Sequence, residues 1–260
     1  MSHAASTSRE VLTSKERVKI SLSWQEPDRV PIQTYLTPEI HKALSSHFQG
    51  KNVDECLGVD FRSVWPSCNR EMRASHDGIW YDEWGSGYRS VTNAAAGSYC
   101  EAVVLPLADL KTMDDVEAYR WPLVEDYDFS RIKADCEKLK DFCITAGCPG
   151  IPDIVNGVSR GRGMEQVLMD IALRDEVGLA IIDKRVDFYY AWCQKLLEAA
   201  DGRIDILHLG EDCGNQNGRM VSPADFDEVF RPRIEKFIKL AHSHGAKAMM
   251  HSCGDTHDIM

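Results

Sequence analysis

Apolar and polar positions follow a regular rhythm in the second half of the chain. Two segments carry apolar residues at helical spacing, "DFSRIKADCEKLK" and "GMEQVLMDIALRD". Between and after them come short runs that are apolar on both sides, "DFCITAGCPG", "IDILHLG" and "AKAMMHSC". A strand that is apolar on both sides is buried on both faces, which is typical of a parallel sheet covered by helices. This half therefore predicts repeated β/α units.

Capping residues mark the helices in this pattern. Ser222 is placed to cap a helix that has Pro223 at its first position and Gly245 just beyond its end. Thr112 is placed to cap another, with acidic residues in its first turn. The apolar spacing also predicts a long helix from about Glu176 to Ala200.

The first half has a less regular pattern. We predict a helix over 8–24, a short buried strand over 29–36 and a helix entered through Pro38. Aromatic, glycine and β-branched residues over 60–104 predict an excursion of β-hairpins. The core parallel strands are then expected at four places: around Val30, Ile144, Ile206 and Met249.

Two α/β architectures fit alternating strands and helices. The glycines of "GVSRGRGME" do not have the G-x-G-x-x-G spacing that would favour a dinucleotide-binding, doubly wound sheet. The length of 260 residues is near the roughly 250 residues of a single (β/α)8 TIM barrel. No repeat or linker divides the chain, so we predict one barrel-type domain over 1–260.

Composition narrows the possible partners and the location. The formal net charge is −11 and no long basic run occurs, which disfavours nucleic acid. No apolar run approaches the roughly 20 residues that span a bilayer, and the polar N-terminus has no signal-peptide core, so no membrane association is expected. Nine cysteines, odd in number and never spaced C-x-x-C, predict reduced thiols in the cytoplasm.

The carboxyl ends of parallel strands are where chemistry is expected. Glu211 and Asp212 follow directly after the predicted strand that contains His208. Paired carboxylates at such a position can hold a metal, orient a substrate or exchange protons, and we assign them as catalytic candidates. The following turn offers Gln216 and Asn217 as further substrate contacts with His208. The alternative is ordinary turn chemistry, with Asp212 capping its own loop.

The "MMHSC" segment is a second polar strand end. Alternation along a strand points His251 and Cys253 toward the same face, and imidazole with thiolate is a favourable donor pair for zinc. The alternative is a buried cysteine beside a hydrogen-bonded histidine. A zinc site also needs a third ligand.

Three further side chains are weaker candidates. Glu83 stands in a hairpin, "YDEWG", that could fold over a barrel mouth and contact substrate, or could be an exposed turn carboxylate. Arg160 and Arg162 stand early in a helix that follows a strand, and could bind a carboxylate or phosphate or simply face solvent.

Several segments, with the lengths between them, resemble the uroporphyrinogen decarboxylase superfamily, and above all its corrinoid-dependent methyltransferases: "EPDRVPI", "PLADLKTMDDVEAYRWP" and "EDCGNQNGRMVSPADFDEVFRPRIEKFIKLAHSHGAKAMMHSCG". The resemblance implies a β/α barrel with an N-terminal helical and hairpin addition. It also implies a zinc site of H-x-C plus a later cysteine, where a thiol acceptor takes a methyl group from a methyl-corrinoid protein or a substrate is demethylated onto the corrinoid. His251 and Cys253 match H-x-C.

The resemblance makes the chain an enzyme, a methyltransferase that uses zinc, a corrinoid-binding partner protein and a small-molecule methyl donor or thiol acceptor. One alternative is a decarboxylase acting on tetrapyrrole carboxylates. That branch has arginines in an R-Q-A-G-R-Y stretch and an aspartate in F-S-D-I, whereas "PIQTYLTPEIHKAL" has no arginine and "DFRSVWPS" lacks the aspartate.

The other alternative concerns the end of the chain. The later cysteine would lie beyond Met260, so we expect an incomplete barrel that could be an inactive remnant or a binding module. Cys213 is a second, less favoured source of a third sulfur.

Overall fold

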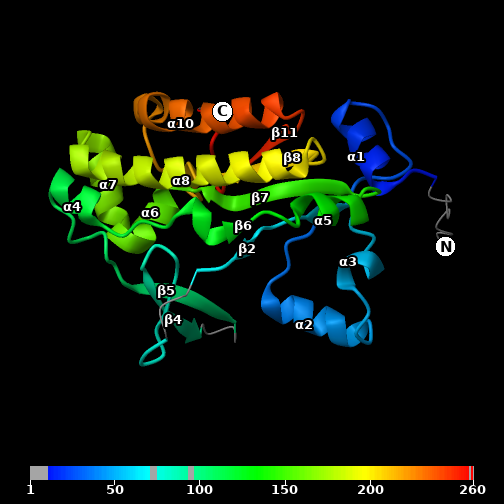
Figure 1. Cartoon of the computed structure of the whole chain (residues 1–260), viewed down its shortest axis with the longest axis horizontal. Coiled ribbons are helices and arrows are strands. Elements are labelled where there is room, and N and C mark those ends of the chain that lie inside the picture. Colours follow the sequence, from blue (N-terminus) through cyan, green and yellow to red (C-terminus); the bar gives the residue numbers. More distant parts are fainter. Residues whose placement is uncertain (1–10, 71–74, 93–96, 258, 260) are drawn as a thin grey trace.

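A four-stranded parallel sheet with the order β1-β7-β8-β11 is the centre of the computed structural model (Figure 1). Its strands are β1 (Phe61–Ser63), β7 (Cys143–Pro152), β8 (Ile206–Gly210) and β11 (Lys247–His251). The structure describes residues 11–70, 75–92, 97–257 and 259. The predicted α/β class with a parallel sheet is confirmed, and so are the strands around Ile144, Ile206 and Met249. The described strands form an open sheet rather than a closed barrel.

The first strand of the sheet is not where the apolar pattern predicted it. Residues 29–36 form no strand, and Val30 is 80% exposed. The backbone amide of Ile32 donates to the carboxylate of Asp60 (2.8 Å) instead of joining a ladder. Phe61–Ser63, which we had placed in the hairpin excursion, takes the position beside β7. The prediction around Val30 was wrong because apolar residues there do not face the core.

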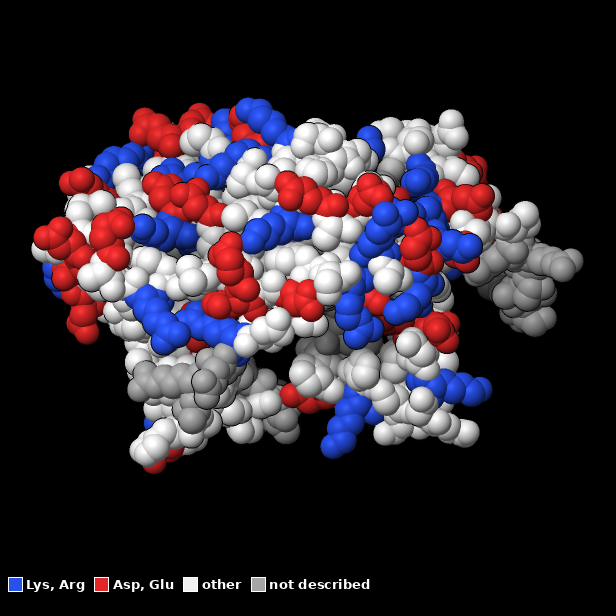
Figure 2. Space-filling view, in the orientation of Figure 1, with Lys and Arg blue, Asp and Glu red and all other residues white. Residues whose placement is uncertain are grey.

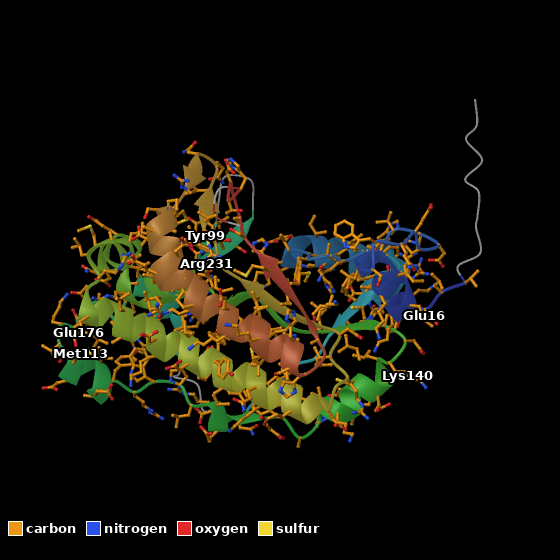
Figure 3. The ribbon with its side chains drawn as sticks, turned by 90° about the horizontal axis from the view of Figure 1, so that it is seen from above. Glu16, Tyr99, Met113, Lys140, Glu176 and Arg231 are labelled. Carbon is orange, nitrogen blue, oxygen red and sulfur yellow. The ribbon has the colours of Figure 1, made fainter. Side chains whose placement is uncertain are left out.

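Helices α8 (Glu176–Ala200) and α10 (Arg231–Ser243) cover one side of the sheet (Figure 1). Seen from above, they run side by side from Glu176 and Arg231, and Glu16 and Lys140 lie at the opposite end of the molecule (Figure 3). The odd-numbered strand residues Leu207 and Leu209 pack into this layer and are completely buried. Both leucines belong to the large cluster of buried apolar side chains between the sheet and these helices, which is the main core of the fold. Burial of each such side chain contributes about 1.5–3 kcal/mol.

The remaining helices connect the strands or flank the sheet. The predicted caps at Thr112 and Ser222, and Pro38 at the start of its helix, are confirmed. A π-helical turn over Phe226–Phe230 precedes Pro232, which has no N–H to continue the α-helical ladder backwards. The other helices are α1 (Ser14–Leu22), α2 (Pro38–His47), α3 (Val53–Cys56), α4 (Met113–Ala118), a 3-10 turn (Val124–Asp126), α5 (Ile132–Lys138), α6 (Ile154–Arg162), α7 (Met164–Leu173) and α9 (Pro223–Asp225).

A separate antiparallel sheet lies on the other side of the parallel one from α8 and α10 (Figure 1). It consists of β3 (Trp80–Tyr81), β4 (Gly87–Thr92) and β5 (Ser98–Val104), which confirms the hairpin excursion. Two short antiparallel pairs complete the strands: β2 (Ser67–Cys68) with β6 (Tyr127–Asp128), and β9 (Gly214–Asn215) with β10 (Gly218–Arg219).

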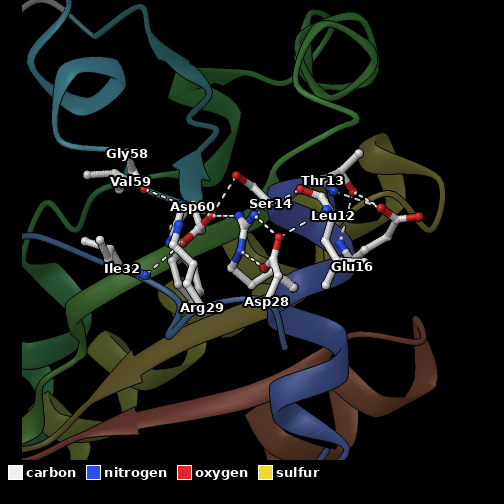
Figure 4. Close-up of polar contacts among 12 residues, drawn as sticks. Leu12, Thr13, Ser14, Glu16, Asp28, Arg29, Ile32, Gly58, Val59 and Asp60 are labelled. Carbon is white, nitrogen blue, oxygen red and sulfur yellow. Dashed lines mark hydrogen bonds and ion pairs between the residues drawn. The ribbon is translucent and has the colours of Figure 1, made fainter. Parts of the chain in front are cut away.

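A buried ion-pair network closes the amino end of the parallel sheet (Figure 4). The carboxylate of Asp60, just before β1, accepts from Arg17 (2.6 Å), Arg29 (2.6 Å) and the Ser14 hydroxyl (2.8 Å). Arg17 also donates to Asp28 (2.6 Å). Every charge here has an opposite charge in contact, which is the condition under which a buried ion can be tolerated.

The face of the molecule in Figure 2 carries lysine, arginine, aspartate and glutamate side chains next to one another, with no extended basic patch on that face. In the described part of the chain, no helix is long and apolar enough to cross a membrane.

Candidate metal centre

Asp212, His251 and Cys253 come together at the carboxyl end of the sheet. Their candidate ligand atoms all lie within 4.8 Å of one another. Nε2 of His251 is 3.4 Å from Sγ of Cys253 and 3.6 Å from Oδ1 of Asp212. The predicted pair of His251 and Cys253 is therefore adjacent, and the third member is Asp212, which we had assigned to catalysis rather than to the metal.

The pairing of β8 with β11 explains this meeting. The strands are parallel and Gly210 is the partner of His251, so residues two positions beyond each stand side by side. The backbone amide of Cys253 donates to Oδ1 of Asp212 (2.8 Å), and the amide of Glu211 donates to the carbonyl of His251 (3.0 Å). Gly254, at φ 74°, then turns the chain away where a side chain would meet the backbone of Asn215.

The helix that follows β7 supports the Asp212 carboxylate. Nδ2 of Asn156, in the first turn of α6, donates to Oδ2 of Asp212 (2.9 Å). Oδ2 is thus held by the Asn156 side chain, whereas Oδ1 accepts from the backbone amide of Cys253 and faces the ring of His251. Hydrogen bonds of this kind fix the orientation of a metal ligand. Sequence reasoning missed Asn156 because it ended the strand at Gly147 and Pro149, whereas β7 continues to Pro152.

Asp153 adds another carboxylate beside the group. It is 5% exposed and adopts left-handed backbone angles (φ 47°, ψ 68°), a conformation that costs energy for a residue other than glycine. Burial raises the pKa of Asp153, and the nearby Asp212 raises it further, against the opposing effect of Arg185 and Arg160. Hydrogen bonding to Asp212, followed by burial, raises the pKa of the Cys253 thiol. The site therefore has excess negative charge that protons or a cation would relieve.

Glu211, the other predicted catalytic carboxylate, points into the protein. It is completely buried, and its oxygens accept from the backbone amides of Ile154 (2.5 Å) and Val155 (3.1 Å) at the start of α6. Burial, followed by the charge of Asp153, raises the pKa of Glu211 to about 8. The structure does not bring Glu211 into the group around His251, and its catalytic role stays a prediction.

His208 lies in the middle of β8 and is 4% exposed. Its Nδ1 is 2.7 Å from the hydroxyl of Tyr35, which comes from the segment wrongly predicted as a strand. Burial, followed by the charge of His251, lowers the pKa of His208, which favours the neutral form of its ring. His208 is the partner of Met249 in the parallel register of β8 and β11, so it faces the same side of the sheet as His251, two residues farther along.

The other predicted contacts lie farther out. Gln216 and Asn217 form the exposed turn between β9 and β10, and Glu83 is in the turn after β3. Cys213 is fully buried in the main core, burial raises its pKa to about 12, and it does not belong to the group of potential ligands. All nine cysteines are free.

The two arginines of α6 have different surroundings. Arg162 is buried and pairs with Asp170 (2.5 Å), so it is part of the core rather than a ligand site. Arg160 is exposed and lines a hollow beside Glu83.

The fold is similar to that of a solved structure of a methyltransferase from Methanosarcina mazei. The TM-score is 0.54 and the sequence identity 18%, over 95% of this chain and 72% of that chain. No family model and no curated protein matches the chain. At this identity the likeness establishes a shared fold.

Proposed function

We propose that this chain is a zinc-dependent methyltransferase of the uroporphyrinogen decarboxylase superfamily that works with a corrinoid-binding protein. The observation that carries the proposal is the meeting of Asp212, His251 and Cys253 at the carboxyl end of the sheet. The fold shared with a methyltransferase supports the same reading.

The donor set fits zinc. Ligands bound tetrahedrally at about 2.0–2.3 Å stand roughly 3.3–3.8 Å apart, from simple geometry. The separations of 3.4 Å and 3.6 Å from His251 to its two neighbours lie at this spacing. Nitrogen, sulfur and carboxylate oxygen are all common zinc donors, and three protein ligands leave a fourth position for a reacting molecule.

The residues of the chain would divide the work. Asp212, His251 and Cys253 would hold the ion, and Asn156 would keep the Asp212 carboxylate turned toward it. When bound, zinc would lower the pKa of a thiol placed at the fourth position. The proton that such a thiol would release can pass to solvent, because the site is open to water: the side chain of His251 is 42% exposed.

Charge at the site favours this function over decarboxylation of a polycarboxylate. Asp153 and Asp212 are neighbours. Of the two arginines that act on Asp153, Arg185 already donates to the backbone carbonyl of Pro152 (2.6 Å), and Arg160 lines the hollow beside Glu83. A substrate with several carboxylates would be repelled by these side chains.

We also propose that the open sheet is part of a barrel of the (β/α)8 type. Its strands are all parallel and stand side by side in the order in which they occur in the chain, with α8 and α10 covering the outer face. Barrels are built by continuing this arrangement.

The test is methyl transfer from methylcobalamin to 2-mercaptoethanol by the zinc-loaded chain. In the balanced reaction the carbon–cobalt bond breaks, a carbon–sulfur bond forms, the electron pair stays on cobalt as Co(I), and the thiol proton is released. We expect an absorbance change that depends on zinc and is lost in His251→Ala. The matched control is His242→Ala, an exposed histidine of α10, which should keep the activity. Equal rates in His251→Ala and the unchanged chain would contradict the proposal.

A further inference from the structure

A hollow of about 420 Å³ lies between the β3–β5 sheet and helices α6 and α8. Trp80, Glu83 and Tyr88 line one wall, and Gly157, Arg160 and Arg185 line the other. The volume is within the range of small-molecule sites, about 300–1,000 Å³. The hairpin wall carries groups that attract a cation, and the helix wall carries groups that attract an anion.

The hairpin wall favours a cation. Trp80 and Tyr88 stack with ring centroids 4.4 Å apart, and aromatic faces attract ammonium groups. The carboxylate of Asp82 is already used, because it accepts from the Tyr88 hydroxyl (2.6 Å) and the backbone amide of Trp84 (2.9 Å). Glu83 is different: its carboxylate has no hydrogen bond or ion pair with any residue that the structure describes.

The helix wall favours an anion. Arg185 is fixed, because it donates to the carbonyl of Pro152 and stands 4.8 Å from the centre of the Tyr189 ring. Gly157 makes room for it, since a side chain there would be 2.2 Å from the guanidinium. Arg160 has no hydrogen bond or ion pair within the described part of the chain, so its guanidinium is available to a ligand.

We infer that this hollow binds a small zwitterion, with its ammonium group against Glu83 and Trp80 and its carboxylate on Arg160. A purely cationic ligand would leave Arg160 unpaired, and a purely anionic one would leave Glu83 unpaired. The carboxylate would accept from Arg160, and guanidinium–carboxylate contacts are among the stronger hydrogen bonds in proteins. The ammonium group would be attracted by Glu83 and by the Trp80 ring. A ligand with both charges satisfies both walls.

The hollow is close to the metal centre but is chemically separate from it. Gly157, on the helix wall, follows directly after Asn156, which holds Asp212. Binding in the hollow requires neither zinc nor a corrinoid, so this inference goes beyond the proposed function and can be tested without it.

Three probes of nearly equal size separate the two charges: glycine betaine carries both, choline carries the ammonium group alone, and 3,3-dimethylbutyrate carries the carboxylate alone. Isothermal titration calorimetry on the full chain should show saturable binding of glycine betaine. We expect choline and 3,3-dimethylbutyrate to bind at least about tenfold more weakly, since choline loses the hydrogen bond from Arg160 and 3,3-dimethylbutyrate loses the attraction of an ammonium group to Glu83 and Trp80. Absence of glycine betaine binding, or equal affinity for the three probes, would overturn the inference.

Two variants assign the charges to residues. Arg160→Gln should weaken glycine betaine and 3,3-dimethylbutyrate but leave choline unchanged, and Glu83→Gln should weaken glycine betaine and choline only. The controls are Arg131→Gln and Glu165→Gln, which remove exposed charges outside the hollow. His251→Ala should lose zinc yet still bind glycine betaine, which separates this result from failure of the methyltransferase proposal. Unchanged glycine betaine affinity in Arg160→Gln or Glu83→Gln would contradict the inference.

Discussion

Asp60 and Glu211 are carboxylates at opposite ends of the same parallel sheet, and both are completely buried. Asp60 contacts two guanidinium groups, whereas Glu211 contacts two backbone amides. Burial alone would raise the pKa of Asp60, but its hydrogen bonds from Arg29 and other donors lower it on balance. Burial raises the pKa of Glu211 to about 8, and its hydrogen bonds do not offset that effect.

This difference distinguishes the amino end of the sheet from the carboxyl end, where we propose the metal centre. At the amino end, acidic and basic groups neutralise each other, so nothing is left for a ligand to satisfy. At the carboxyl end, Asp153, Glu211 and Asp212 gather without an equal number of available cations. Burial raises the pKa of Asp153 and of Glu211, and carboxylates perturbed in this way are frequent at functional sites. Asp212, between them and the end of β11, contacts His251 and Cys253.

The largest expected effect is at the amino end. Asp60→Asn removes the buried carboxylate that both Arg17 and Arg29 contact, so the network loses one of its negative charges, and we expect a loss of about 3–5 kcal/mol in the free energy of unfolding. Urea unfolding measures it, and zinc binding of the folded fraction should not change. A loss below about 1 kcal/mol would mean that the network does not hold this end together.

The second effect is the pH dependence from Glu211. Because its pKa is raised from 4.5 unfolded to about 8 folded, its stabilising contribution is complete below pH 4.5 and is lost as pH rises through 8. Between pH 5 and 8 the unchanged metal-free chain should lose on the order of 3 kcal/mol relative to Glu211→Gln. Urea unfolding across this range measures the difference. Parallel stability curves for the two proteins would show that Glu211 does not change protonation there.

A smaller effect is expected from the support of Asp212. Asn156→Ala frees one carboxylate oxygen, and we expect zinc affinity to fall about 10–100-fold. Competition with a chromophoric chelator measures it. Asn217→Ala, in the exposed turn between β9 and β10, is the control and should bind zinc as the unchanged chain does. Equal zinc affinities of the unchanged chain, Asn156→Ala and Asn217→Ala would show that Asn156 does not support the metal site.

The smallest effect concerns Ser252. Its hydroxyl accepts from the backbone amide of Cys213 (3.1 Å) and donates to the carbonyl of Cys253 (3.0 Å). Ser252→Ala should cost about 1 kcal/mol of stability and change zinc affinity only slightly, because its contacts hold the backbone rather than a ligand atom. A large drop in zinc affinity would show that the loop geometry depends on this hydroxyl.

Apolar periodicity predicted the strands that are buried on both faces, β7, β8 and β11, since burial is what that pattern records. It failed around Val30, because apolar residues can also lie on an exposed extended segment. His251 and Cys253 were found through strand alternation and the H-x-C spacing. Asn156 was missed and Asp212 was given another role, because the register of β8 against β11 and the true end of β7 decide which side chains meet.

Zinc content is the most direct test of the metal centre. The purified chain is stripped with a chelator, reloaded with zinc, passed through a desalting column and measured by atomic emission, beside His251→Ala and the His242→Ala control. We predict about one zinc ion per chain for the unchanged protein and for the control, and none retained by His251→Ala. Equal zinc content in His251→Ala and the unchanged protein would contradict the assignment.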